Sequence, residues 1–106
     1  MTRTHSIEWS PQARQDVLNT HSYFEEFSPH AATEFAAAMR KSLQLLEELP
    51  RLGSPMTNVP LPGNFHSLLV AKKYRLIYRI EGERLIIYRV WDCRRDPSGM
   101  WDKPQK

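Results

Sequence analysis

A stretch of alternating apolar and basic residues from Tyr74 to Pro97 constrains the fold of this chain more than any other feature. It contains two runs of period two, separated by the turn-forming sequence Glu81-Gly82-Glu83. Residues two apart in a strand lie on the same face, and a short turn with glycine joins antiparallel strands. We therefore expect a β-hairpin. Its first strand places Leu76, Tyr78 and Ile80 on one face and Arg75, Ile77 and Arg79 on the other, and the alternation repeats from Leu85 to Trp91.

Two helix-start signals precede this hairpin. Ser10-Pro11 and Ser28-Pro29 each combine a good N-cap residue with proline at the first helical position. The first predicted helix runs from about Pro11 to Phe27, and the second runs from Pro29 until Pro50 stops it. Because so few residues separate them, the two helices are expected to form an antiparallel hairpin.

The rest of the chain supplies two more strands and a loop. Residues 4–9 and Phe65–Ala71 read as strands, and a basic turn at Lys72-Lys73 follows the second of them. Residues 50–64 contain four prolines and two glycines, which predict an irregular loop. The order strand, helix, helix and three strands predicts an α+β fold, with the helical hairpin packed on one face of a small, mainly antiparallel four-stranded sheet.

The composition bounds the chain to one small domain. Its 106 residues are 41% hydrophobic and 25% charged, which is typical of a globular unit with a modest core. We expect a single domain over residues 1–97 and a tail over residues 98–106. The tail is expected to be weakly ordered unless Met100 and Trp101 dock on the domain.

Several functional classes are disfavoured at this stage. No run of 18 apolar residues occurs and the first residues lack the apolar core of a signal peptide, so we expect a cytoplasmic protein. The single cysteine, Cys93, excludes an internal disulfide and is expected to be a partly buried, small apolar residue. His5, His21 and His30 show no metal-ligand spacing, so no metal and no cofactor are predicted.

Charge is distributed unevenly along the chain. Residues 7–49 contain three basic and seven acidic residues, whereas residues 66–95 contain eight basic and three acidic residues. This two-sided distribution predicts that the basic part faces an acidic partner, either nucleic acid or protein. The alternative is a solvated sheet face without a partner.

An ordered set of short motifs resembles the RelE/ParE superfamily of bacterial type II toxins, with the ParE-like branch favoured. The resemblance covers residues 7–97. Its motifs are Trp9-Ser10-Pro11 with Ala13 and Asp16, Ser28-Pro29 with Ala31-Ala32, Leu49-Pro50 with Gly53, LLVAKKYRLIYRI, and VWDCRRDP.

The resemblance implies a toxin made from the same operon as an antitoxin. In this family the C-terminal segment of the antitoxin, often a helix followed by an extended stretch, wraps the toxin and covers its basic surface. RelE-like members cleave mRNA in the ribosomal A site, whereas ParE-like members bind DNA gyrase and trap it on cleaved DNA. The resemblance leaves the choice between these activities open.

RNA cleavage needs cations for the phosphate and groups that transfer protons. Arg75 and Arg95 lie where RelE-like toxins place phosphate-binding arginines, although a structural or antitoxin-contacting role is the alternative. The position of the RelE-type tyrosine falls on Trp101, which cannot transfer protons. Asp92 replaces a histidine found in many relatives and is expected to pair with Arg94 or Arg95.

Two lysines of RelE-like enzymes fall on His66 and Leu68, which leaves His66 as the one candidate base. If the chain were a nuclease, its catalytic residues would be His66, Arg75 and Arg95.

We therefore favour a non-enzymatic, ParE-like toxin that inhibits growth by binding DNA gyrase and is neutralised by a cognate antitoxin. A RelE-like ribosome-dependent endoribonuclease and a degenerate toxin that only binds its antitoxin remain as alternatives. The residues expected to contact the target or the antitoxin are Lys72, Lys73, Arg75, Arg79, Arg89, Arg94, Arg95 and Trp101.

Overall fold

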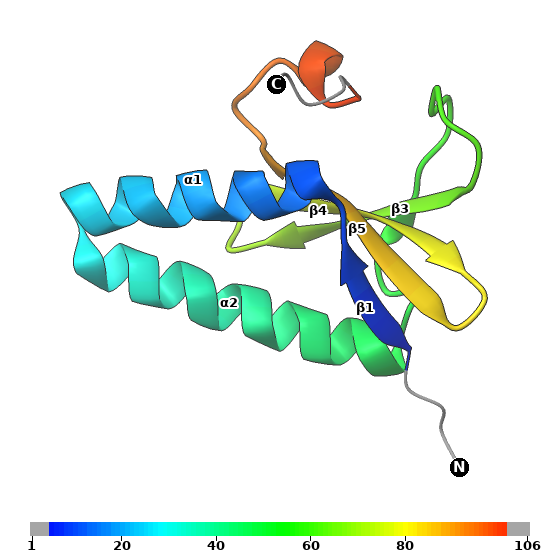
Figure 1. The fold of residues 1–106 in the computed structure, drawn as a ribbon, viewed down its shortest axis with the longest axis horizontal. Coiled ribbons are helices and arrows are strands. Elements are labelled where there is room, and N and C mark those ends of the chain that lie inside the picture. The colour runs from blue at the N-terminus through cyan, green and yellow to red at the C-terminus, as the bar shows by residue number, and fades with distance from the viewer. Residues whose placement is uncertain (1–4, 102–106) are drawn as a thin grey trace.

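The computed structural model describes residues 5–101, which form two helices packed on one mixed sheet (Figure 1). The sheet has five strands in the order β1-β5-β4-β3-β2, and β1 is parallel to β5 while the other pairs are antiparallel. The elements are β1 (Ser6–Trp9), α1 (Pro11–Phe27), α2 (Pro29–Glu48), β2 (Ser54–Pro55), β3 (Asn64–Val70), β4 (Tyr74–Glu81), β5 (Arg84–Asp92) and the 3-10 turn η1 (Pro97–Gly99). The predicted α+β class is confirmed, and the sheet has five strands where four were predicted.

Serine caps fix the starts of both helices as predicted. The Ser10 hydroxyl accepts a hydrogen bond from Ala13 N (3.0 Å) and donates one to the Tyr88 carbonyl (2.7 Å), which ties the start of α1 to β5. The Ser28 hydroxyl accepts a bond from Ala31 N (3.3 Å), and Ser28 N closes α1 by donating to the Phe24 carbonyl (2.6 Å). Because Ser28 serves both helices, the chain reverses over one residue (Figure 1).

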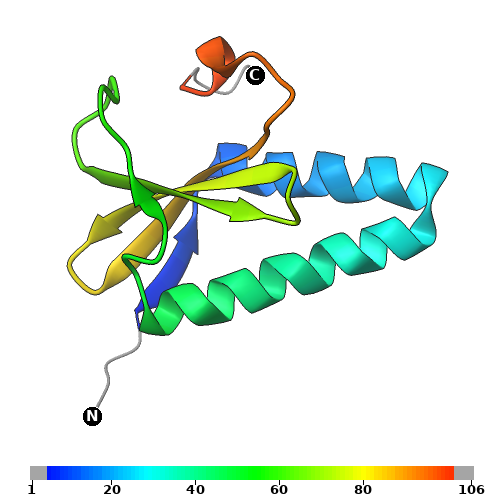
Figure 2. The same cartoon turned by 180° about the vertical axis from the view of Figure 1, so that it is seen from behind.

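Strand β2 lies in the segment that was predicted to be an irregular loop. It pairs with His66 and Ser67 of β3, and the loop runs beside that strand (Figure 2). The buried hydroxyl of Tyr78 holds the loop, because it donates to the Pro50 carbonyl (2.7 Å) and accepts from Gly53 N (3.0 Å). A β-carbon at Gly53 would lie 2.7 Å from the Ser67 carbonyl oxygen, so only glycine fits this close approach.

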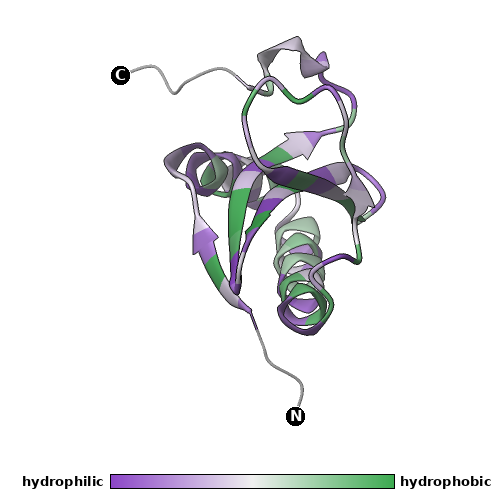
Figure 3. Cartoon of the chain, turned by 90° about the vertical axis from the view of Figure 1, so that its right-hand side faces the viewer, coloured by the Kyte–Doolittle hydropathy of each residue, from purple (hydrophilic) through white to green (hydrophobic). Residues whose placement is uncertain are grey.

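The sheet has one face covered by the helices and one open face. Apolar and polar residues alternate along the strands (Figure 3). The helix-covered face holds the larger core, which includes Phe35, Leu46, Leu76, Tyr78 and Leu85. The open face carries a smaller cluster of buried residues, formed by Phe65, Ile77, Trp91 and Met100, against which Tyr88 and Trp101 pack.

A bulge in β5 breaks the predicted alternation from Leu85 to Trp91. Ile77 pairs with Arg89 and Tyr78 pairs with Ile87, so Tyr88 has no partner in the register. An extra residue reverses the faces of the residues that follow it. The expectation of one continuous period is therefore wrong beyond Ile87, and Trp91 lies on the open face.

The tail docks on the sheet as far as it is described. Met100 is buried, and the Trp101 ring stacks on Tyr88 and meets Phe65 edge to face, with both pairs of ring centroids 5.3 Å apart. The tail was expected to be ordered if Met100 and Trp101 dock, and both residues do. Residues 102–106 lie outside the described part of the chain. Over residues 5–101, no helix combines the length and the apolar character needed to cross a membrane.

Candidate functional site

Five exposed cations lie at one end of the sheet, which we call the basic end: Lys72, Lys73, Arg75, Arg94 and Arg95. The β3–β4 turn and the end of β5 bring them together, since Cys93 N donates to the Lys73 carbonyl (2.8 Å) and Arg75 pairs with Trp91. Ala71 and Lys72 have positive φ angles of 53° and 61°, which makes this turn tight. Backbone hydrogen bonds and strand pairing therefore fix the positions of the segments that form the basic end.

The three arginines of the basic end differ in what they contact. Arg94 is paired with Asp92 through two bonds of 3.1 and 2.7 Å, and this contact lowers the pKa of the Asp92 carboxyl. Arg75 donates to the Ser67 hydroxyl (3.1 Å). The Arg95 guanidinium lies 4.2 Å from the centre of the Trp91 ring, a cation–π contact that leaves its N–H groups free to bond elsewhere.

Arg89 does not belong to the exposed surface on which it was predicted. Its side chain is 11% exposed and forms two bonds of 2.9 Å with Asp16 of α1, and it also donates to the Met100 carbonyl (3.1 Å). The Asp16 carboxylate accepts a further bond from Val90 N (2.9 Å). Arg89 therefore joins α1, β5 and the tail, and its donors are occupied within the chain.

Arg79 and Trp101 lie away from the basic end. Arg79 is near the opposite end of β4, where it pairs with Glu81 (2.7 Å). Trp101 packs on the open face against Tyr88 and Phe65. The sequence predicted one binding surface that includes these two residues, whereas in the structure they lie apart from the basic end.

His66 is the candidate base, and the structure separates it from Arg75 and Arg95. It is 2% exposed and stacks on Tyr78 with ring centroids 5.6 Å apart. His66 pairs with Tyr78 in the register, so it shares the helix-covered face, whereas Arg75 points from β4 to the open face. Burial lowers the pKa of His66. The three residues of the nuclease hypothesis do not form one site.

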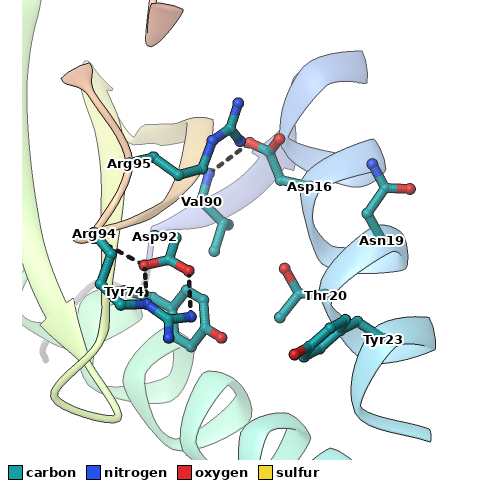
Figure 4. Close-up of a pocket in the computed structure, with 9 residues that line it drawn as sticks. All are labelled: Asp16, Asn19, Thr20, Tyr23, Tyr74, Val90, Asp92, Arg94 and Arg95. Carbon is teal, nitrogen blue, oxygen red and sulfur yellow. Dashed lines mark hydrogen bonds and ion pairs between the residues drawn. The ribbon is translucent and has the colours of Figure 1, made fainter. Parts of the chain in front are cut away.

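A pocket of about 360 Å³ lies between α1 and the end of β5, beside the basic end (Figure 4). Residues at helical spacing on α1 form one wall, and Tyr74 with the last residues of β5 and the segment after it form the other. The lining residues are Asp16, Asn19, Thr20, Tyr23, Tyr74, Val90, Asp92, Arg94 and Arg95. Sequence reasoning missed the α1 residues. Their spacing marks one helix face, but only the packing of α1 against β5 makes that face a pocket wall.

Cys93 is exposed, which corrects the expectation that it is partly buried. It follows β5 immediately, where the chain turns away from the sheet at the basic end. No group of three or more histidine, cysteine or acidic side chains suited to a metal ion occurs within residues 5–101.

Two helices on one face of a five-stranded mixed sheet form a RelE/ParE-like fold. Residues 7–97 match the family model described as "ParE toxin of type II toxin-antitoxin system, parDE", so the chain belongs to the ParE toxin family. No curated protein sequence matches the chain.

Three solved structures share the fold. A chain of the chromosomal ParDE toxin-antitoxin system from P. aeruginosa aligns with a TM-score of 0.66 at 16% identity, covering 84% of this chain and 96% of that one. The RelBE2 toxin-antitoxin complex from Mycobacterium tuberculosis gives 0.58 at 25% identity, with 84% and 98% covered. The YoeB dimer from Staphylococcus aureus gives 0.58 at 21% identity, with 83% and 95% covered.

Proposed function

We propose that this toxin inhibits bacterial growth in the cytoplasm by binding DNA gyrase through the basic end, and that a cognate antitoxin neutralises it by covering that surface. The observation that carries the proposal is the match to the ParE family over residues 7–97. The basic end supports it, because five exposed cations on a rigid sheet suit an acidic protein surface.

The arrangement of side chains also favours binding over RNA cleavage. A cleavage site needs a proton-transfer group within hydrogen-bond reach of the reacting atoms. His66 is buried on the opposite face of the sheet from Arg75, and Asp92 is occupied by Arg94. In the described part of the chain, Trp101 stands where a tyrosine would be needed, and an indole cannot act as an acid or base.

The purified chain tests the proposal in two parallel assays. Supercoiling by gyrase should be inhibited and gyrase cleavage complexes should accumulate, while mRNA on translating ribosomes should stay intact. Cleaved mRNA with unaffected gyrase would refute the gyrase target and favour the nuclease alternative. Normal growth on induction together with inactivity in both assays would favour a degenerate toxin.

Charge reversal locates the surface. Arg75→Glu and Arg95→Glu should weaken gyrase inhibition at least about tenfold, because each replaces an attractive charge with a repulsive one. Lys41→Glu is the matched control, since Lys41 is an exposed cation on α2, far from the basic end in sequence and on a different element. Equal loss in all three folded variants would mean that net charge, and not the basic end, governs binding.

A further inference from the structure

The two carboxylates that line the pocket in Figure 4 are already paired. Both oxygens of Asp16 accept bonds from Arg89, and one of them also accepts a bond from Val90 N. Both oxygens of Asp92 accept bonds from Arg94. The two carboxylates in the wall are therefore neutralised by arginines of the same chain.

Several donors that line the same pocket are free. Within residues 5–101, no acceptor bonds to the Arg95 guanidinium, to the Thr20 hydroxyl or to the hydroxyls of Tyr23 and Tyr74. Asn19 accepts a bond from Gln15 through its oxygen, which leaves its amide N–H groups as donors. Burial, with a smaller contribution from Asp92, raises the pKa of Tyr74, so its hydroxyl keeps its proton. A pocket whose carboxylates are paired and whose other lining groups can donate is suited to an oxyanion.

The charges around the pocket favour one carboxylate over a chain of phosphates. Arg95 is the one cation of the lining without a carboxylate partner among the described residues, so it matches a single negative charge. Along α1 the wall is followed by the exposed Glu26, three residues after Tyr23. A nucleic-acid backbone entering here would place further phosphates near Glu26, which is unfavourable.

The pocket also offers apolar contacts beside the charge. The Tyr23 ring is 57% exposed at the mouth and lies 4.8 Å from the Phe27 ring, which is 67% exposed. Val90 and Tyr74 form part of the inner lining (Figure 4). A peptide segment could insert an acidic side chain while its neighbouring residues pack on these rings.

We propose that this pocket binds the carboxylate of an aspartate or glutamate side chain of the antitoxin, held by Arg95 with Asn19 and Thr20, while the tyrosine hydroxyls at the other end of the pocket bond to neighbouring groups of the same peptide. The carboxylate site stands on the pocket alone, whereas its occupant rests on the proposed neutralisation by an antitoxin. Arg95 stacks on Trp91 before any ligand arrives, so little side-chain entropy is lost when it binds.

Acetate is the probe for the pocket itself. ¹⁵N-labelled full-length protein is titrated with sodium acetate and, separately, with sodium phosphate, at an ionic strength held constant with sodium chloride. We expect saturable shifts of the Arg95 Nε–H and Asn19 side-chain amide resonances with acetate, and weaker binding of phosphate. Arg95→Gln should reduce acetate affinity at least about tenfold, which corresponds to the loss of one charge-assisted contact. Thr20→Val should reduce it less, and the matched Lys41→Gln should leave it unchanged.

The titration tests both the anion site and its preference for a carboxylate. Resonance shifts that never saturate, or that persist in folded Arg95→Gln protein, would refute the proposal that this pocket binds an anion. Tighter binding of phosphate than of acetate would refute the preference for a carboxylate. If acetate does not bind, the proposal that the toxin inhibits gyrase is unaffected, because the titration contains no gyrase.

Binding of the protein encoded by the neighbouring gene tests whether an antitoxin side chain occupies the pocket. Its complex should dissociate at least about tenfold faster from the Arg95→Gln variant and not from Lys41→Gln. Unchanged dissociation would overturn the antitoxin as occupant. A neighbouring protein that fails to bind the wild-type chain at all would refute the proposed neutralisation.

Discussion

Arg89 and Arg95 show how the surroundings of a side chain decide what it can do. Both guanidinium groups lie over the Trp91 ring, at 4.8 and 4.2 Å from its centre. Arg89 is also clamped by Asp16, so removing either partner would leave a nearly buried charge without compensation. Arg95 has no such partner among the described residues, and its donors remain available to a ligand. Of two arginines with identical chemistry, one is therefore committed to the structure and the other is available to a ligand.

At the same scale, His66 predicts how stability depends on pH. Burial places its folded-state pKa below the ordinary value, so the unfolded chain binds a proton that the folded protein does not. Stability should be complete above about pH 6.5 and should be lost as the pH falls below it, by at most about 1.4 kcal/mol per pH unit for one proton.

Urea unfolding at pH 5, 6, 7 and 8 measures this dependence. His66→Phe keeps an aromatic ring on Tyr78 and removes the titrating group, so its curve should be flatter. His30→Gln is the control, because the His30 side chain is 84% exposed. If the His66→Phe variant shows the same pH dependence of stability as the wild type, groups other than His66 determine that dependence.

At the scale of elements, local signals fix the helices while the strands depend on distant partners. Both Ser-Pro pairs cap a helix at the predicted residue, since capping needs only a side chain and an N–H three residues away. Strand β2 and the bulge in β5 have no such local code. Strand β2 lies in the loop that Tyr78 holds after α2, and the bulge is a shift in the register between β4 and β5.

The two capping serines predict different losses of stability. Ser28→Ala removes one cap bond and should cost about 1 kcal/mol. Ser10→Ala also removes the bond to the Tyr88 carbonyl and should cost about 2 kcal/mol. Chemical denaturation of both variants measures the difference. Equal losses would mean that the link from α1 to β5 contributes nothing.

At the scale of the whole molecule, charge is distributed unevenly between the two helices and the basic end of the sheet, which lies beside them. The basic end gathers cations from the β3–β4 turn and the segment after β5, while α1 and α2 together carry six acidic and three basic residues. Such a separation orients an approaching partner over a distance comparable to the Debye length. Association with gyrase should therefore depend on salt.

Raising sodium chloride from about 50 to 500 mM should slow gyrase association at least about tenfold, because it shortens the Debye length. Surface plasmon resonance on immobilised gyrase would measure the rate. Arg95→Glu should start from a lower rate and show a shallower dependence. An association rate that is independent of salt would contradict a charge-directed encounter.

The sequence by itself determined the helical hairpin, the β-hairpin, the fold class and the separation of charge. Each of these depends on residues close together in the chain, through caps, alternation and turns. It also marked the cations that gather at the basic end, because the turn at Lys72-Lys73 and the end of β5 are joined by hairpin pairing.

Only the tertiary structure decided which of these cations are free and what lies beside them. Asp16 and Arg89 are 73 residues apart, and their pairing removes one arginine from the predicted surface. The bulge at Tyr88 placed Trp91 beneath Arg95, and the register of β3 placed His66 on the face opposite Arg75. Such outcomes depend on packing between distant segments, which periodicity along the chain does not encode.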